Sequence, residues 1–217
     1  MSPEYATCKT GKEQSPLDLP PTDKAKTIDV ATNYAVKNGA IENDGHGIKA
    51  SFEKGFTLTS GDKSYDLLQF HFHTPSENLF GGKASPADVH FVHSDANGNL
   101  AVLGVMINEG AASPQMQAIL DDQKTLEIIS VGAASPQMQA ILDNIGGKTD
   151  LDLKAMLPAS MTAYNFKGSL TTPPCSEGVN WHVLTTPVTA SKEQIEALNK
   201  ITGNNARPVQ PLNERAI

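Results

Sequence analysis

The sequence has few cysteines, few aromatic residues and no excess of positive charge. Its 217 residues include 2 cysteines and a single tryptophan, and aromatic residues make up 6% of the chain. Lys and Arg number 17 against 24 Asp and Glu, which gives a net charge of −7. Because nucleic acids are bound mainly through basic patches, this balance and the lack of a basic cluster argue against a nucleic-acid-binding protein.

Long apolar runs are absent as well. No stretch approaches the roughly 20 apolar residues of a membrane-spanning helix, so the sequence predicts no membrane span. The start, Met1-Ser2-Pro3, shows neither the charged beginning nor the apolar core of a signal peptide. With 39% hydrophobic residues, the chain can bury one substantial core, and we expect a single domain over residues 1–217.

Histidines alternate with phenylalanines in the segment 69–73, Gln-Phe-His-Phe-His. Side chains two apart on a strand share a face, so Gln69, His71 and His73 are predicted to project together. The opposite, apolar layer is predicted to receive Leu68, Phe70 and Phe72.

A second strand is expected to complete a metal site. The loop 74–87 contains two prolines and two adjacent glycines, so it can return the chain and place Asp88 and His90 beside the first pair. Three neutral imidazoles on zinc leave a fourth position open for water. Gln69 can accept a hydrogen bond from His71, and Asp88 from His90. A lone strand histidine is usually solvated or hydrogen-bonded, but three in this pattern predict a zinc site without naming its reaction.

Longer motifs carry a resemblance to a known family. They resemble the α-class carbonic anhydrases in their secreted bacterial form, and they run in family order along the chain: 69–77, 168–181 and 207–211, with shorter matches at 14–16, 42–46 and 100–104. The resemblance implies a mostly β (α+β) fold, with one large, twisted, mainly antiparallel sheet, short peripheral helices and zinc at the base of a conical cleft.

The resemblance also implies an activity, the zinc-dependent reversible hydration of carbon dioxide to bicarbonate and a proton. His71, His73 and His90 would bind zinc, and zinc-bound hydroxide would attack the substrate. Carbonic anhydrases are themselves the standard example of such a site, in which the pKa of the bound water is about 7. Sulfonamides or anions are expected as inhibitors at the zinc.

Three further residues are implied to take part in catalysis. Thr171 matches a threonine that accepts a hydrogen bond from the hydroxide and donates one to Glu77; an ionised carboxylate can only accept, so this direction is chemically required. Read alone, the segment 171–174 is merely a turn signal. His46 matches the family's proton shuttle, and the alternative is an exposed loop histidine without a role.

Binding roles are implied for several more residues. Thr172 matches a residue at the mouth of the pocket that contacts bicarbonate and inhibitors, and Asn205 one whose backbone carbonyl orients His73. The hydrophobic pocket for carbon dioxide would be lined by Val92, Val102, Leu170, Val179 and Trp181. Ordinary core packing is the alternative for these five and does not exclude the pocket.

Cys8 and Cys175 are implied to form a disulfide, as in the similar bacterial enzymes. Two cysteines are compatible with one bridge, and two unpaired thiols are the alternative. A disulfide implies an oxidising compartment, and we expect a periplasmic or secreted protein.

The sequence departs from the family pattern in three places. Nothing matches the family's His-Trp-Gly-Tyr motif, position 88 is Asp where the family generally has Glu, and the twelve residues 110–121 recur letter for letter as 132–143, a period of 22 residues. Each copy reads as a short helix, so the repeat is either a neutral insertion or a choice between two docked helices. A homodimer or a helix-exchanged oligomer is compatible with it. The rival function is a non-catalytic carbonic-anhydrase-like binding or assembly module.

Overall fold

The computed structural model describes residues 5–43, 47–110, 114 and 147–217. Among the predictions above, those for His46 and, apart from Gly110 and Pro114, those for the repeated segments 110–121 and 132–143 lie outside these residues. No helix among the described residues is long and apolar enough to cross a membrane.

Strands contain far more of the described residues than helices do, and the helices are short. The strands are β1 (Asp18–Leu19), β2 (Thr27–Asp29), β3 (Ala31–Thr32), β4 (Val36–Asn43), β5 (Ile48–Ser51), β6 (Thr57–Ser60), β7 (Lys63–His73), β8 (Leu79–Phe80), β9 (Lys83–Ala84), β10 (Ala87–Ser94), β11 (Leu100–Glu109), β12 (Lys148–Asp152), β13 (Thr162–Ser169), β14 (Glu177–Leu184) and β15 (Val188–Ala190). The helices are α1 (Thr7–Thr10), α4 (Lys192–Thr202) and two single 3₁₀ turns, η2 (Thr22–Lys24) and η3 (Lys154–Met156).

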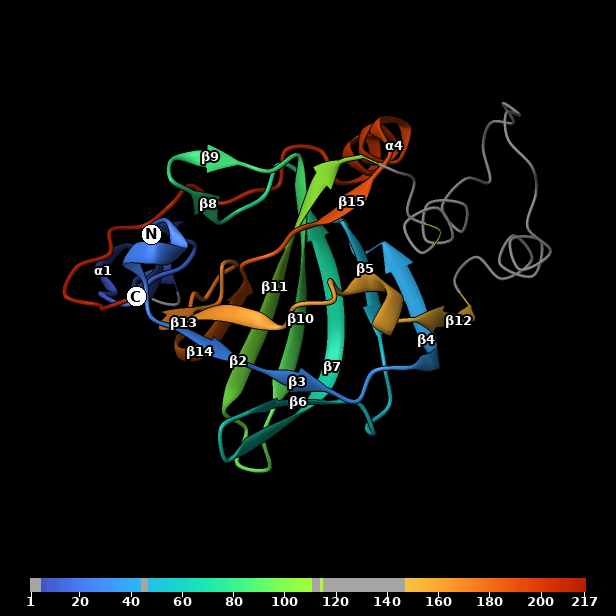
Figure 1. Cartoon of the computed structure of the whole chain (residues 1–217), viewed down its shortest axis with the longest axis horizontal. Coiled ribbons are helices and arrows are strands. Elements are labelled where there is room, and N and C mark those ends of the chain that lie inside the picture. Colours follow the sequence, from blue (N-terminus) through green and yellow to red (C-terminus); the bar gives the residue numbers. More distant parts are fainter. Residues whose placement is uncertain (1–4, 44–46, 111–113, 115–146) are drawn as a thin grey trace.

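One large twisted sheet forms the centre of the molecule (Figure 1), in the order β12-β4-β5-β7-β10-β11-β14-β13-β2 with β3, β6 and β15 attached. Among the described strands, β11 pairs in parallel with β14 and β15, and the other pairs of this sheet are antiparallel. A small sheet, β1-β8-β9, lies at its side. The expected mostly β fold is therefore confirmed.

Each face of the central strands packs into its own apolar cluster. Alternate residues of a strand point to opposite faces, so Phe70 and Phe72 of β7 enter the larger cluster, together with Phe91 of β10. The smaller cluster, on the other face, contains Val92 and Trp181. The histidines of β7 alternate with its phenylalanines and so lie on the face of the smaller cluster.

Leu68 does not lie in the apolar layer, contrary to the prediction. Val92 of β10 pairs with Gln69, but the next residue, His93, pairs with Leu67, so Leu68 is an extra residue in a β-bulge. The bulge shifts the alternation by one residue, which buries Leu67 completely and leaves Leu68 36% exposed.

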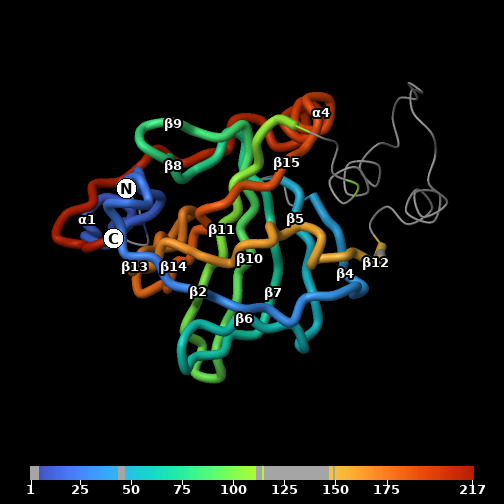
Figure 2. Tube along the Cα trace, viewed as in Figure 1, coloured from blue at the N-terminus to red at the C-terminus, as the bar shows by residue number. Residues whose placement is uncertain are grey.

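Helix α4 begins as its sequence indicates. Ser191 Oγ accepts from the backbone N–H of Gln194 at 3.2 Å, and Gln194 Oε1 accepts from the N–H of Ser191 at 3.1 Å, which is a capping box. The helix ends before Gly203, whose positive φ of 62° favours glycine. Figure 2 shows α4 beside β15, at one end of the sheet.

Two histidines are buried on the face away from His71, His73 and His90. The Tyr34 hydroxyl forms a hydrogen bond of 2.6 Å with Nε2 of His93, and burial raises the pKa of Tyr34. Nε2 of His182 lies 2.9 Å from Ser60 Oγ. Burial lowers the pKa of His93 to about 3 and that of His182 to about 4, against opposing backbone groups. Both imidazoles are neutral in the folded protein.

These histidines should make folding acid-sensitive. Their folded pKa values lie below the ordinary 6.5, so their contribution to stability is full above pH 6.5 and is lost as the pH falls toward 4 and 3. Each should lower the free energy of unfolding by about 1.4 kcal/mol per pH unit within that window. Urea unfolding of His182→Gln and of the unchanged protein in the same metal state, at pH 7 and at lower pH, measures this. Equal slopes in both proteins would contradict the assignment.

Candidate metal centre

The pairing of β7 with β10 brings three histidines together. His90 lies directly opposite His71, and Asp88 lies opposite His73. Because directly opposite residues on antiparallel strands point to the same face, His90 projects beside the two histidines of β7. His71 is half-buried, whereas His73 and His90 are buried.

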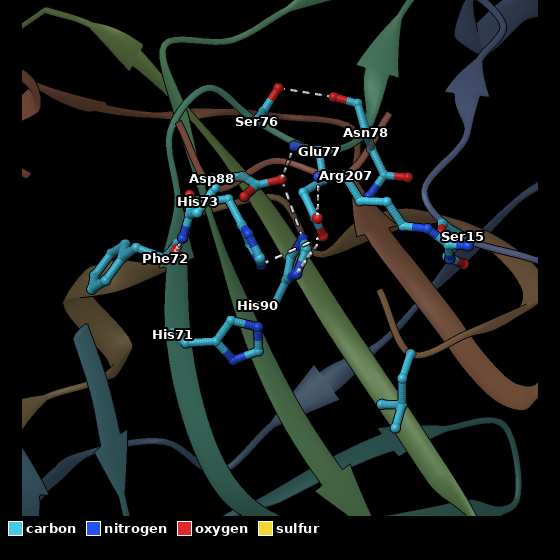
Figure 3. Close-up of polar contacts among 12 residues, drawn as sticks. Ser15, His71, Phe72, His73, Ser76, Glu77, Asn78, Asp88, His90 and Arg207 are labelled. Atoms are coloured by element: carbon cyan, nitrogen blue, oxygen red, sulfur yellow. Dashed lines mark hydrogen bonds and ion pairs between the residues drawn. The ribbon is translucent and has the colours of Figure 1, made fainter. Parts of the chain in front are cut away.

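The three imidazoles converge, as Figure 3 shows. One ring nitrogen of each lies within 4.8 Å of the others, and the ring centroids are 4.7 to 5.5 Å apart. Among the described residues, these three are the one group of His, Cys, Asp and Glu placed to hold a metal ion in this way.

Partner side chains determine which nitrogens of His71 and His90 face the metal position. Nδ1–H of His71 donates to Gln69 Oε1 at 2.9 Å, so Nε2 of His71 is the nitrogen available to a metal ion. Nε2–H of His90 donates to Asp88 Oδ2 at 3.2 Å, so Nδ1 of His90 is the nitrogen available to a metal ion. The shorter Asp88 therefore reaches His90 directly. Its Oδ2 also accepts from the backbone N–H of Glu77 at 3.0 Å, and this second bond orients the carboxylate.

Burial and charge set the protonation of the site. Burial lowers the pKa of His71 well below its ordinary value, and the nearby His73, His90 and Lys49 lower it further. Burial also lowers the pKa of His73. For His90, burial acts in the same direction, but the charge and hydrogen bond of Asp88, together with the charge of Glu77, outweigh it and raise the pKa, which makes the ring a more basic ligand.

Asn205 holds the backbone on both sides of His73. Its Nδ2 donates to the carbonyl of Phe72 at 3.0 Å, and its Oδ1 accepts from the N–H of Thr74 at 3.0 Å. The backbone of Asn205 also raises the pKa of His73, against the larger effect of burial. Both ring nitrogens of His73 are buried without a hydrogen-bond partner. A buried imidazole in this state needs a partner, and a metal ion would supply one.

Glu77 lies above the three histidines (Figure 3). Its Oε1 accepts from the backbone N–H of Arg207 at 2.8 Å. Its Oε2 lies 3.4 Å from Nε2 of His73 and 3.7 Å from Nδ1 of His90, and it has no hydrogen-bond partner. The predicted hydrogen bond from Thr171 to Glu77 is not formed. Thr171 is half-buried and directly precedes Thr172, Pro173 and Pro174, which line the cleft.

A cleft of about 870 Å³ opens over the histidines. It is lined by His71, His73, Gln69, Thr172 and Asn205, as well as Tyr5, Gly47, Ile48, Lys49, Phe72, Pro173, Pro174 and Thr202. Thr172 thus lies on the cleft wall, as the resemblance implies. His46 itself is not described, but its neighbour Gly47 lines the cleft.

The five residues predicted to line the carbon dioxide pocket gather in the smaller apolar cluster. Val92, Val102, Val179 and Trp181 are buried there, and Leu170 packs against them. The Trp181 ring meets His90 edge-on, with centroids 4.9 Å apart. Through Trp181 this cluster contacts one of the three histidines, but none of the five residues is among those that line the open cleft.

Cys8 and Cys175 form the predicted disulfide. It joins α1 to the segment that follows Thr171, Thr172 and the two prolines of the cleft wall. The Arg207 guanidinium ties the same region together: it donates to the carbonyl of Cys8 at 2.9 Å and to that of Ser15 at 2.7 Å.

Sequence reasoning did not assign roles to Arg207 or Lys49. Arg207 lies within a quoted motif, but only the fold shows that its backbone N–H binds Glu77. Lys49 lies opposite His71 on the neighbouring strand β5 and lines the cleft, which depends on strand pairing and is not contained in a local motif.

The chain matches the family of eukaryotic-type carbonic anhydrases over residues 2–217. It belongs to the carbonic anhydrase family. A carbonic anhydrase of Pectobacterium carotovorum is 40% identical over 218 residues, which cover 100% of this chain and 84% of that protein.

Solved α-carbonic anhydrases have the same fold. The enzyme of Photobacterium profundum superposes with a TM-score of 0.80 at 39% identity, over 98% of this chain and 91% of its own. The enzyme of Thermovibrio ammonificans, solved with the inhibitor sulfanilamide, gives a TM-score of 0.80 at 38% identity, over 99% and 90%. The zinc dependence of this family agrees with the donor set, since three neutral imidazoles suit zinc.

Asp88 should control the strength of metal binding. In Asp88→Ala, Nε2–H of the buried His90 loses its acceptor, and zinc affinity should fall about 10- to 100-fold. This range comes from metal sites that include those of carbonic anhydrases. Competition with a chelator measures the affinity, and Asp62→Ala, in the exposed turn before β7, is the matched control. An Asp88→Ala protein that binds zinc as tightly as the control would refute this role.

Proposed function

We propose that this carbonic anhydrase family member hydrates carbon dioxide to bicarbonate and a proton at the cleft over β7 and β10. The observation that carries the proposal is the convergence of three buried or half-buried imidazole nitrogens within 4.8 Å. Nε2 of His71, Nε2 of His73 and Nδ1 of His90 would hold zinc. When bound, zinc supplies a water that loses its proton near neutral pH, as is established for carbonic anhydrases.

Glu77 and Thr171 would orient the reacting groups. The backbone N–H of Arg207 donates to Oε1 of Glu77. Oε2 is therefore the oxygen that can accept a hydrogen bond from Thr171. A buried carboxylate oxygen without a donor is costly, which favours an arrangement in which the threonine hydroxyl donates to it. Because Thr171 then donates to Glu77, its oxygen can only accept on the side of the cleft.

The two halves of the site suit a neutral substrate and an anionic product. Carbon dioxide is apolar, and the cluster around Val92, Val102 and Trp181 beside His90 offers an apolar surface for it, completed by Val179 and Leu170. Thr172, on the wall of the cleft, is the candidate contact for bicarbonate and for inhibitors such as sulfonamides.

A proton must leave the site in each cycle, and His46 is the proposed carrier. Its ordinary pKa near 6.5 suits transfer at neutral pH. The position of Gly47 on the cleft wall supports this role, because the preceding residue is joined directly to that wall.

The disulfide supports a periplasmic or secreted location, since such bonds persist in oxidising compartments. The rival function is a non-catalytic binding or assembly module. The complete set of His71, His73 and His90, with Glu77 and Thr171 also present, favours the enzyme.

Stopped-flow hydration of carbon dioxide separates the two functions. The zinc-loaded protein should accelerate hydration far above the buffer rate. The His90→Ala variant should lose tight zinc binding, and hydration should fall to that of the buffer. Stoichiometric zinc in the unchanged protein without any acceleration would eliminate the enzyme.

The same experiment tests the proton carrier. In weak buffer, His46→Ala should slow turnover on the order of tenfold or more while zinc stays bound, and added imidazole should restore the rate. Full turnover by His46→Ala in weak buffer would remove His46 from the mechanism.

A further inference from the structure

A row of paired residues crosses the sheet through the metal ligands. Glu42 of β4 is paired with Lys49 of β5, Lys49 with His71 of β7, and His71 with His90 of β10. Residues directly opposite each other on antiparallel strands share a face, with Cβ atoms about 4.5–5.5 Å apart. Lys49 therefore projects from the same face as His71 and is its immediate neighbour.

Lys49 brings a positive charge to the cleft. Its side chain is 29% exposed, and Nζ lies 2.8 Å from Oε1 of Glu42, whose side chain is 55% exposed. Among the described residues that line the cleft, Lys49 is the one with a permanently charged side chain at neutral pH; the others are aromatic, aliphatic, amide, hydroxyl or imidazole groups. Glu42 is not among the lining residues, so its negative charge lies farther from the cleft than that of Lys49.

This arrangement distinguishes ligands by charge. A cation on the wall of a partly enclosed, low-dielectric cleft attracts anions and leaves uncharged molecules unaffected. In the hydration reaction the substrate is neutral and the product is an anion. A lysine at this position would thus act on the product, and on anionic inhibitors, without acting on the substrate.

We propose that Lys49 is a specificity-determining residue that favours negatively charged ligands in the cleft, and that Glu42 moderates its charge. The proposal rests on the proposed function, since it assigns the residue that sets the balance between neutral substrate and anionic product. Lys49 has no part in the chemical step.

A pair of ligands that differ in one charge tests this directly. Para-carboxybenzenesulfonamide and the uncharged para-carbamoylbenzenesulfonamide have nearly the same shape, and calorimetric titration of the zinc-loaded protein measures binding of each. The quantity of interest is the ratio of their two dissociation constants, because a general effect on sulfonamide binding cancels in it.

Lys49→Gln should weaken binding of the carboxylate relative to the carboxamide by about two- to fivefold, the range for partly exposed charge pairs. Lys49→Arg should keep the ratio of the unchanged protein. Glu42→Gln should shift the ratio toward the carboxylate. The difference should vanish at about 1 M salt, where the screening length is near 3 Å.

Lys54→Gln is the matched control. Lys54 is 77% exposed, lies 3.4 Å from Asp66 and is not among the residues that line the cleft, so its removal should leave the ratio unchanged. An unchanged ratio in Lys49→Gln, or an equal shift in Lys54→Gln, would overturn the proposal.

Failure of the function is distinguishable from failure of this proposal. If the unchanged protein binds both sulfonamides but does not hydrate carbon dioxide, the function fails and the ratios still decide the role of Lys49. If it hydrates carbon dioxide and the Lys49→Gln ratio is unchanged, the role of Lys49 alone fails. A zinc-loaded protein that binds neither compound counts against both.

Discussion

The antiparallel pairing of β7 with β10 is the constraint on which the rest of the site depends. With His71 opposite His90 and His73 opposite Asp88, one register supplies three ligands and a carboxylate partner from two strands. A slip by one residue would turn the histidines of one strand to the opposite face. The phenylalanines between the histidines resist such a slip, because Phe70 and Phe72 are buried in the larger cluster. The apolar core and the metal site therefore specify the same register.

Hydrogen bonds and a disulfide from distant parts of the sequence fix the residues that surround the three histidines. Asn205 binds the peptide groups on both sides of His73, and Arg207 joins Glu77 to the segment around Cys8 and Ser15. The disulfide from Cys8 to Cys175 closes the same region next to the cleft wall. The segments near both termini thus support a candidate site whose histidines lie on β7 and β10. A loss of packing in either segment should weaken metal binding.

The mostly β fold and the cluster of three histidines could be predicted from the sequence. The cluster follows from the alternation of residues along a strand, and the fold follows from the long motifs that resemble a known family. The strand expected at Gln69–His73 is of this kind. Leu68 was placed wrongly because a β-bulge depends on the partner strand, which alternation within one strand does not contain. The contacts of Arg207 and the neighbourhood of Lys49 depend on pairing between distant segments, so no local pattern could reveal them. The Thr171–Glu77 hydrogen bond, expected by resemblance, requires side-chain positions that the structure does not have.

We expect His71, His73 and His90 together to bind one zinc ion and to leave one coordination position open. X-ray absorption at the zinc K edge of the loaded protein tests it most directly, because imidazole rings give a characteristic scattering pattern. We expect three imidazole nitrogens at about 2.0–2.1 Å and one further light-atom ligand. A spectrum with two imidazoles or fewer, or one left unchanged by replacing any one of the three histidines with alanine, would contradict it.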